Sequence, residues 1–130
     1  MRDSLTIERR EVGGVPVLAL GGDLTGPDAR RVAAALRSLA GRGPGLVVIL
    51  SRLDLVDTPG IDALLSWRGP GDLLLAGAAR ALAEELREQG LPDGVRLVAR
   101  EADALRALGV DPPAGRGRER RRSTRGCAAA

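Results

Sequence analysis

The sequence predicts one α/β domain built on a mixed β-sheet, and three observations lead to that fold class. Residues 46–50 are five consecutive bulky apolar residues, which is typical of a strand covered on both faces. Two apolar runs flank Gly13-Gly14, a pair of residues that favours the turn of a hairpin. After residue 50, short apolar runs alternate with segments of helical periodicity. A hairpin followed by such βα alternation predicts a mixed sheet with helices packed on it.

The elements follow in the order β-β-α-β-α-β-α-β-α. We expect strands at residues 4–10, 15–20, 46–50, 73–76 and 95–98. We expect helices at about 27–40, 59–67, 79–89 and 102–108. The first of these helices begins after Thr25-Gly26-Pro27-Asp28, which offers a cap and an early Pro. The folded domain is expected to span residues 1–111.

The link between the central strand and the next helix contains Asp57-Thr58-Pro59-Gly60. The strand is expected to end at Ser51-Arg52, with Thr58 as the helix N-cap and Pro59 at the first helical position. Such a cap contributes about 1 kcal/mol and needs no further function. The same hydroxyl could instead carry a phosphate, which would meet free N–H groups and add about −1.5 to −2 charge beside Asp57. Composition alone favours the cap.

Composition argues against most enzyme classes. The chain has no His, no Lys and a single Cys, so a nucleophilic hydroxyl would lack an ordinary base, and zinc sites and Walker loops are not expected. Asp54, Asp57 and Asp62 could hold Mg²⁺, but we favour a turn for Asp54 and a solvated helix face for Asp62. We therefore expect no catalytic activity, no metal and no cofactor.

Two further absences suggest the location of the protein. No run of about 18 apolar residues could span a membrane, and the chain starts without an apolar signal region. We therefore expect a cytoplasmic protein without membrane insertion.

The basic character of the chain belongs to residues 112–130. They hold six Arg and one Glu, a net charge of +5, whereas residues 1–111 hold 14 Arg and 16 acidic residues, a net charge of −2. We expect this tail to be disordered, and no aromatic residue interleaves its Arg residues, so specific nucleic-acid binding is not expected. Cys127-Ala128-Ala129-Ala130 matches a prenylation box, which we regard as accidental because Ala is common in the chain.

One stretch resembles a known family. Residues 55–65, Leu-Val-Asp-Thr-Pro-Gly-Ile-Asp-Ala-Leu-Leu, resemble the signature of the STAS domain, the fold of bacterial anti-sigma factor antagonists. The similarity covers about residues 4–110 and implies a STAS-like mixed sheet. Gly22-Asp23-Leu24-Thr25 resembles the family's loop beside the phosphorylation site. Pro59 stands where relatives have a small residue.

The resemblance implies a binding module that regulates transcription. In such antagonists, the hydroxyl residue after the Asp is phosphorylated by the anti-sigma factor, a serine kinase. The unphosphorylated antagonist binds the kinase and frees the sigma factor, and the phosphorylated form lets go. The phosphorylated residue would be Thr58, and the partner-binding residues would be Asp23, Thr25, Asp57, Thr58, Pro59, Gly60 and Asp62.

Two other roles remain open. The chain also resembles stand-alone STAS subunits that dock on the ATPase of a lipid-transporting ABC complex, in which the Thr works without phosphorylation. A third possibility is a scaffold role in a stress-signalling assembly. The identity of the partner separates these roles: a soluble kinase, a membrane-associated ATPase, or other STAS chains.

Overall fold

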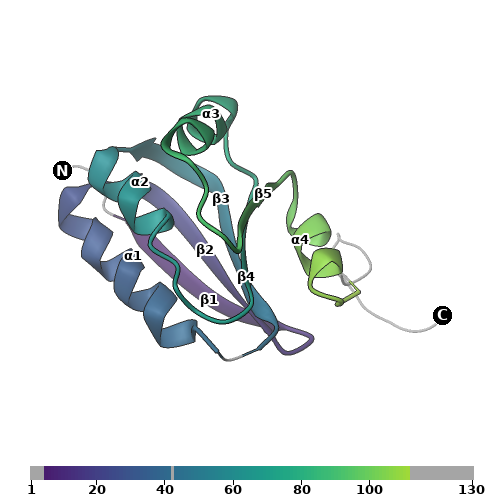
Figure 1. Cartoon of the computed structure of the whole chain (residues 1–130). Coiled ribbons are helices and arrows are strands. Elements are labelled where there is room, and N and C mark those ends of the chain that lie inside the picture. Colours follow the sequence, from purple (N-terminus) through teal and green to yellow (C-terminus); the bar gives the residue numbers. More distant parts are fainter. Residues whose placement is uncertain (1–4, 42, 112–130) are drawn as a thin grey trace.

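The computed structural model describes residues 5–41 and 43–111, which form a five-stranded sheet with four helices (Figure 1). The strands are β1 (Thr6–Val12), β2 (Val15–Leu24), β3 (Gly45–Val56), β4 (Asp72–Ala76) and β5 (Val95–Val98). The helices are α1 (Gly26–Leu39), α2 (Thr58–Leu64), α3 (Arg80–Gln89) and α4 (Glu101–Ala107). The predicted order of elements is confirmed. The tail expected at residues 112–130, with Cys127, lies outside the described residues.

The strands lie in the sheet in their sequence order, β1-β2-β3-β4-β5. β1 and β2 form the predicted antiparallel hairpin around Gly13-Gly14, and the remaining neighbours are parallel. In the parallel part, the carboxyl ends of β2 and β3 meet at one end of the sheet. The starts of α1 and α2 therefore lie at that same end.

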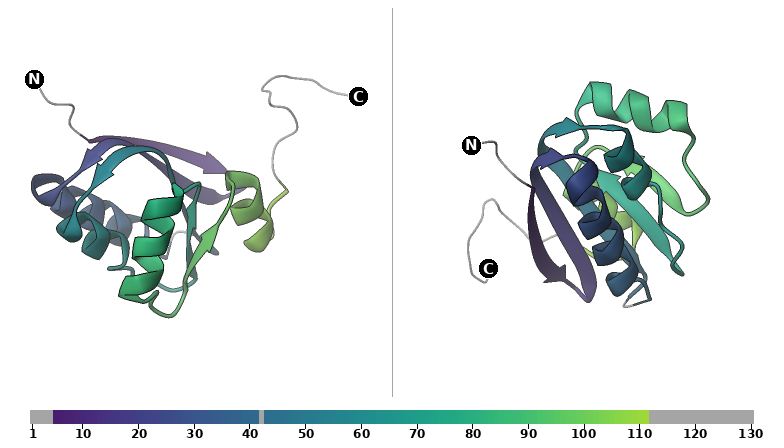
Figure 2. Two further views of the ribbon diagram at one scale, coloured as in Figure 1. Left: turned by 90° about the horizontal axis from the view of Figure 1, so that it is seen from above. Right: turned by 90° about the vertical axis from the view of Figure 1, so that its left-hand side faces the viewer.

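Helices cover both faces of the sheet (Figure 2). The larger apolar layer lies under α1, α2 and α3, and the smaller one lies under α4. Successive residues of β3 alternate between them: Leu46, Val48 and Leu50 face the larger layer and Val47 faces the smaller one, and all four are at most 1% exposed. The prediction of a central strand buried on both faces is thus confirmed.

The last helix is tied to the first strand. Ala104 and Leu105 are fully buried against the smaller layer. At the surface, Arg10 of β1 pairs with Glu101 through two hydrogen bonds, of 2.9 and 3.1 Å. The hydrogen bond to Glu101 raises the pKa of Arg10, so the Arg10 guanidinium stays charged at every physiological pH.

Three boundaries differ from the sequence predictions by more than two residues. β2 ends at Leu24 and not at Leu20. β3 does not stop at Ser51-Arg52, because β2 also continues and pairs with it as far as Val56. Asp54 consequently lies in a strand and not in a turn. α2 ends at Leu64, three residues before the expected end.

Beyond α2, the indole of Trp67 is buried. Its side chain is 4% exposed, and its Nε1–H donates to the carbonyl oxygen of Gly71 at 3.2 Å. The indole packs with Leu36 and Ala40 at the end of α1. None of the four described helices is long and apolar enough to cross a bilayer.

Candidate functional site

Two strand-to-helix junctions lie side by side at the carboxyl end of the parallel strands. β2 leads into α1 at Thr25, and β3 leads into α2 at Asp57. Leu24 and Val56, the last residues of the two strands, are paired in register. The carbonyl oxygen of Leu24 accepts the N–H of Asp57 at 3.2 Å, so the sheet ladder continues into the second junction.

The carboxylate of Asp57 caps both helices. Its Oδ1 accepts the N–H of Gly60 at 3.0 Å in α2, and its Oδ2 accepts the N–H of Gly26 at 2.9 Å in α1. The prediction that Thr58 is the N-cap is therefore wrong: Asp57 is the N-cap and Thr58 is the first helical residue. A carboxylate is favoured in this place because it has two acceptor oxygens and a full negative charge near two positive helix ends.

Gly60 allows the two junctions to approach each other. A Cβ at this position would lie 2.6 Å from the carbonyl oxygen of Leu24 and 3.0 Å from Cγ1 of Val56. Any larger side chain would push α2 away from the end of β2. Gly60 is buried, so its expected part in partner binding is indirect.

Thr58 and Pro59 are exposed at the tip of the junction. The Thr58 hydroxyl forms no hydrogen bond with any described residue. The first turn of α2 offers little to a phosphate: Pro59 has no N–H, Gly60 donates to the Asp57 carboxylate, and Ile61 donates to the Asp57 carbonyl at 2.9 Å. The expectation of several free N–H groups is thus corrected, because only the N–H of Thr58 itself has no acceptor among the described residues.

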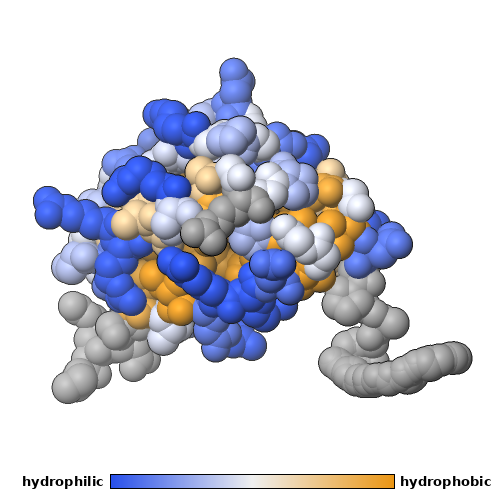
Figure 3. All heavy atoms as spheres, turned by 90° about the horizontal axis from the view of Figure 1, so that it is seen from below, coloured by the Kyte–Doolittle hydropathy of each residue, from blue (hydrophilic) through white to orange (hydrophobic). Residues whose placement is uncertain are grey.

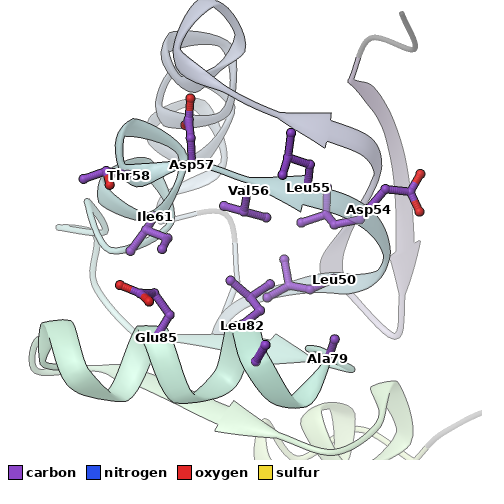
Figure 4. Close-up of a pocket in the computed structure, with 12 residues that line it drawn as sticks. Leu50, Asp54, Leu55, Val56, Asp57, Thr58, Ile61, Ala79, Leu82 and Glu85 are labelled. Carbon is purple, nitrogen blue, oxygen red and sulfur yellow. The ribbon is translucent and has the colours of Figure 1, made fainter.

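A groove of about 480 Å³ opens beside Thr58, between the end of β3, α2 and α3 (Figure 4). Leu82 and Glu85 of α3 point across it toward Val56 and Ile61. Leu55 of its lining is 53% exposed, a high value for a large apolar side chain. The full lining is Leu50, Leu53, Asp54, Leu55, Val56, Asp57, Thr58, Ile61, Ala79, Ala81, Leu82 and Glu85, which includes three carboxylates and no Arg.

The remaining predicted site residues lie around the paired junctions. Asp23 is half-buried one residue before the end of β2, Thr25 is the N-cap of α1, and Asp62 is exposed on α2. In the described part of the chain, no three His, Cys, Asp or Glu side chains come close enough to hold a metal ion, so Asp54, Asp57 and Asp62 are not brought together.

Sequence analysis missed the double cap of Asp57 and the wall that α3 contributes to the groove. The first had a signal, because Asp57 precedes Gly60 by three residues, the spacing of an N-cap to the N–H that it accepts. Leu82 and Glu85 had none, because tertiary packing alone places α3 against the end of β3.

Comparison with known proteins agrees with this geometry. A family model described as "Mlab, STAS domain" matches residues 7–107. The fold is similar to a crystal structure of an anti-sigma factor antagonist from Mycobacterium paratuberculosis, with a TM-score of 0.70, 21% identity, and 82% of this chain and 95% of that chain covered. No curated protein sequence matches the chain significantly.

Two other solved structures share the fold. The anti-sigma factor antagonist SpoIIAA in its unphosphorylated form gives a TM-score of 0.60 at 15% identity, with 80% of this chain and 98% of that chain covered. A sulfate transporter family protein from Wolinella succinogenes gives a TM-score of 0.60 at 22% identity, with 77% of this chain and 88% of that chain covered. Because the family match spans most of the described domain and includes both junctions, the chain belongs to the STAS domain family.

Proposed function

We propose that the surface around Thr58 binds an anti-sigma factor kinase and that phosphorylation of Thr58 releases this partner, so that the protein regulates sigma-factor-dependent transcription. It acts as a binding module and not as an enzyme. The observation that carries the proposal is the exposed Thr58 hydroxyl, unbonded within the described residues, on a junction whose adjacent carboxylate is already used for capping. The anti-sigma factor antagonists among the structural neighbours support it.

The electrostatics of the site explain how such a switch would work. A phosphate adds about −1.5 to −2 charge at neutral pH. It would stand beside Asp57, and no Arg lines the adjoining groove. With few free N–H groups to fold back on, the phosphate would stay at the surface and repel the partner. We therefore expect the switch to change the surface charge and leave the fold unchanged.

The test compares four forms of the full chain: wild type, Thr58→Ala, Thr58→Glu and Ala107→Glu. Each is used as bait in lysate of the native cell, and captured proteins are identified by mass spectrometry. We expect wild type, Thr58→Ala and the control Ala107→Glu to capture a kinase-type anti-sigma factor, and Thr58→Glu to lose it. Ala107 is a suitable control because it is exposed on α4, across the sheet from α2.

Phosphorylation is tested directly on the same material. Trypsin releases residues 53–68 as one peptide, in which Thr58 and Ser66 are the hydroxyl residues. With the captured kinase and ATP, a phosphate should appear on Thr58 of this peptide and be absent from Thr58→Ala. Equal capture by the Ala and Glu variants would overturn the proposed interface.

A second candidate is the STAS subunit of a lipid-transporting ABC complex, and the description of the matching family favours it. In that role the partner is a membrane-associated ATPase, and Thr58 acts through its hydroxyl without being phosphorylated. Capture of an ABC ATPase by wild type, with no phosphate on the 53–68 peptide, would select this candidate over the kinase.

A further inference from the structure

One wall of the groove beside Thr58 is an unpaired strand edge. β3 pairs with β4 only over Gly45–Ile49, whereas it pairs with β2 as far as Val56. Over Leu53–Val56, the edge away from β2 makes no backbone hydrogen bond with other described residues. An open edge of this kind binds an extended segment through its backbone groups.

The charge of the groove specifies what such a segment must carry. Asp54 and Glu85 line the groove, and neither forms an ion pair within the described residues. No Arg lies in the lining, and the remaining wall is mostly apolar. The groove therefore fits an extended, strongly cationic segment.

The chain itself contains such a segment beyond Asp111. Of the six Arg residues in 112–130, four fall within Arg120-Arg121-Arg122-Ser123-Thr124-Arg125. We propose that residues 120–125 occupy the groove of their own chain, with their Arg side chains on Asp54 and Glu85. This docking holds whether or not Thr58 is phosphorylated, so it goes beyond the proposed function.

The length of chain beyond Asp111 decides which Arg residues can reach Asp54 in the groove. Val110 packs against Gly13 in the β1–β2 turn, and Gly43 lies beside Gly14, so the described chain ends level with the start of β3. Figure 1 shows this exit next to α4, at the other end of the sheet from α3. Asp54 lies nine residues along β3 from Gly45, a distance of about 30 Å.

A fully extended chain spans about 3.3–3.6 Å per residue. Arg116 and Arg118, five and seven residues beyond Asp111, therefore reach no more than about 18 and 25 Å. Arg122 and Arg125, at 11 and 14 residues, reach about 40 and 50 Å. The backbone of residues 120–125 can therefore lie along Leu53–Val56, whereas the backbone at Arg116 and Arg118 falls short of Asp54.

Other apolar surface is less suited to this segment. Seen from below relative to Figure 1, apolar residues show in stretches separated by hydrophilic side chains (Figure 3). The pocket beside Trp67 is lined by Arg37 and Arg68, which would repel an Arg-rich segment. A segment docked in the groove would lie against Thr58 and compete with any partner there.

The test uses Cys127, the single cysteine of the chain, to carry a nitroxide spin label on the full-length protein. At low salt, we expect the amide signals of Leu53, Leu55 and Leu82 to have less than half the intensity that they have after chemical reduction of the nitroxide. At 1 M salt they should recover, because the Debye length shrinks to about 3 Å. The double variant Asp54→Asn with Glu85→Gln should also restore the intensity of these amide signals.

A matched pair of variants separates docking from general attraction. Arg121→Gln with Arg122→Gln should abolish the broadening, whereas Arg116→Gln with Arg118→Gln removes the same charge and should leave it. The proposal would be overturned if both double variants lost the broadening equally. It would also be overturned if the broadening were confined to α4 and the β1–β2 hairpin. Groove broadening in a ¹⁵N chain without label, mixed with labelled ¹⁴N chain, would assign the segment to a second copy and overturn docking within one chain.

Discussion

Adjacent residues at the β3–α2 junction have separate tasks. Asp57 is turned inward and accepts N–H groups from two helices, while Thr58 is turned outward and has no intramolecular bond within the described residues. Stability therefore depends on the first residue, and the chemistry proposed for the surface depends on the second. A substitution at either position tests one task without the other.

We expect Asp57→Ala to lower the free energy of unfolding by about 2–3 kcal/mol, because one truncation removes the caps of α1 and α2. Thr58→Ala should change it by less than about 0.5 kcal/mol, as is usual for an exposed side chain. Urea unfolding followed by far-UV circular dichroism measures both. Similar losses in the two variants would mean that the Asp57 carboxylate does not hold the helices.

At the scale of elements, the length of β3 is the main feature. Its first half is paired on both edges, and its second half is paired on one edge and forms the wall of the groove. The strand extends past the polar Ser51-Arg52 because β2 supplies hydrogen bonds as far as Val56. A long strand next to a short β4 thus creates the open edge.

Hydrogen exchange should separate the two halves of β3. At 1 M salt, where residues 120–125 should not dock, we expect all amides from Leu46 to Ile49 to exchange slowly. The amides within Leu53–Val56 that point away from β2 should then exchange at least about 100-fold faster, as at weakly protected edges. Residue-resolved NMR exchange on the wild-type chain provides the measurement. Uniform protection along β3 at 1 M salt would show that this edge is not open. Extra protection of Leu53–Val56 that appears only at low salt would be that of residues 120–125 docked on the edge.

The elements themselves could be predicted from the sequence, and their ends could not. Apolar runs such as 46–50 and helix stripes such as Val32, Leu36 and Leu39 locate strands and helices through local periodicity, and the structure buries these residues as expected. The extension of β3 and the capping of α1 by Asp57 depend on contacts between segments 31 residues apart. The Thr58 hydroxyl was found through a motif, and the groove beside it required the placement of α3.

At the scale of the molecule, the sheet separates two unequal apolar layers, and α4 alone covers the smaller one. Leu105 is fully buried there, while Leu108 at the end of the helix is half-buried. Because the strands of the sheet contribute to both layers, loss of packing on one face should weaken the whole domain.

We expect Leu105→Ala to cost about 2–5 kcal/mol and Leu108→Ala distinctly less. If the domain unfolds as one unit, the slowest amides of α1, on the opposite face, should lose protection by the same free energy in Leu105→Ala. Native-state hydrogen exchange of Leu36 reports on this. Unchanged protection at Leu36, with loss confined to α4, would show that α4 detaches by itself.

The buried Trp67 has an optical consequence. It is the sole aromatic residue of the chain, so all intrinsic fluorescence comes from one indole packed between the end of α1 and the segment leading to β4. Thr58 lies at the other end of α2 and outside the surroundings of that indole. Unfolding should shift the emission to the red, whereas a tryptophan-free ligand bound at Thr58 should leave the spectrum unchanged. The emission of Trp67 can therefore report on folding while such a ligand is present, and binding can be followed separately through a probe on the ligand.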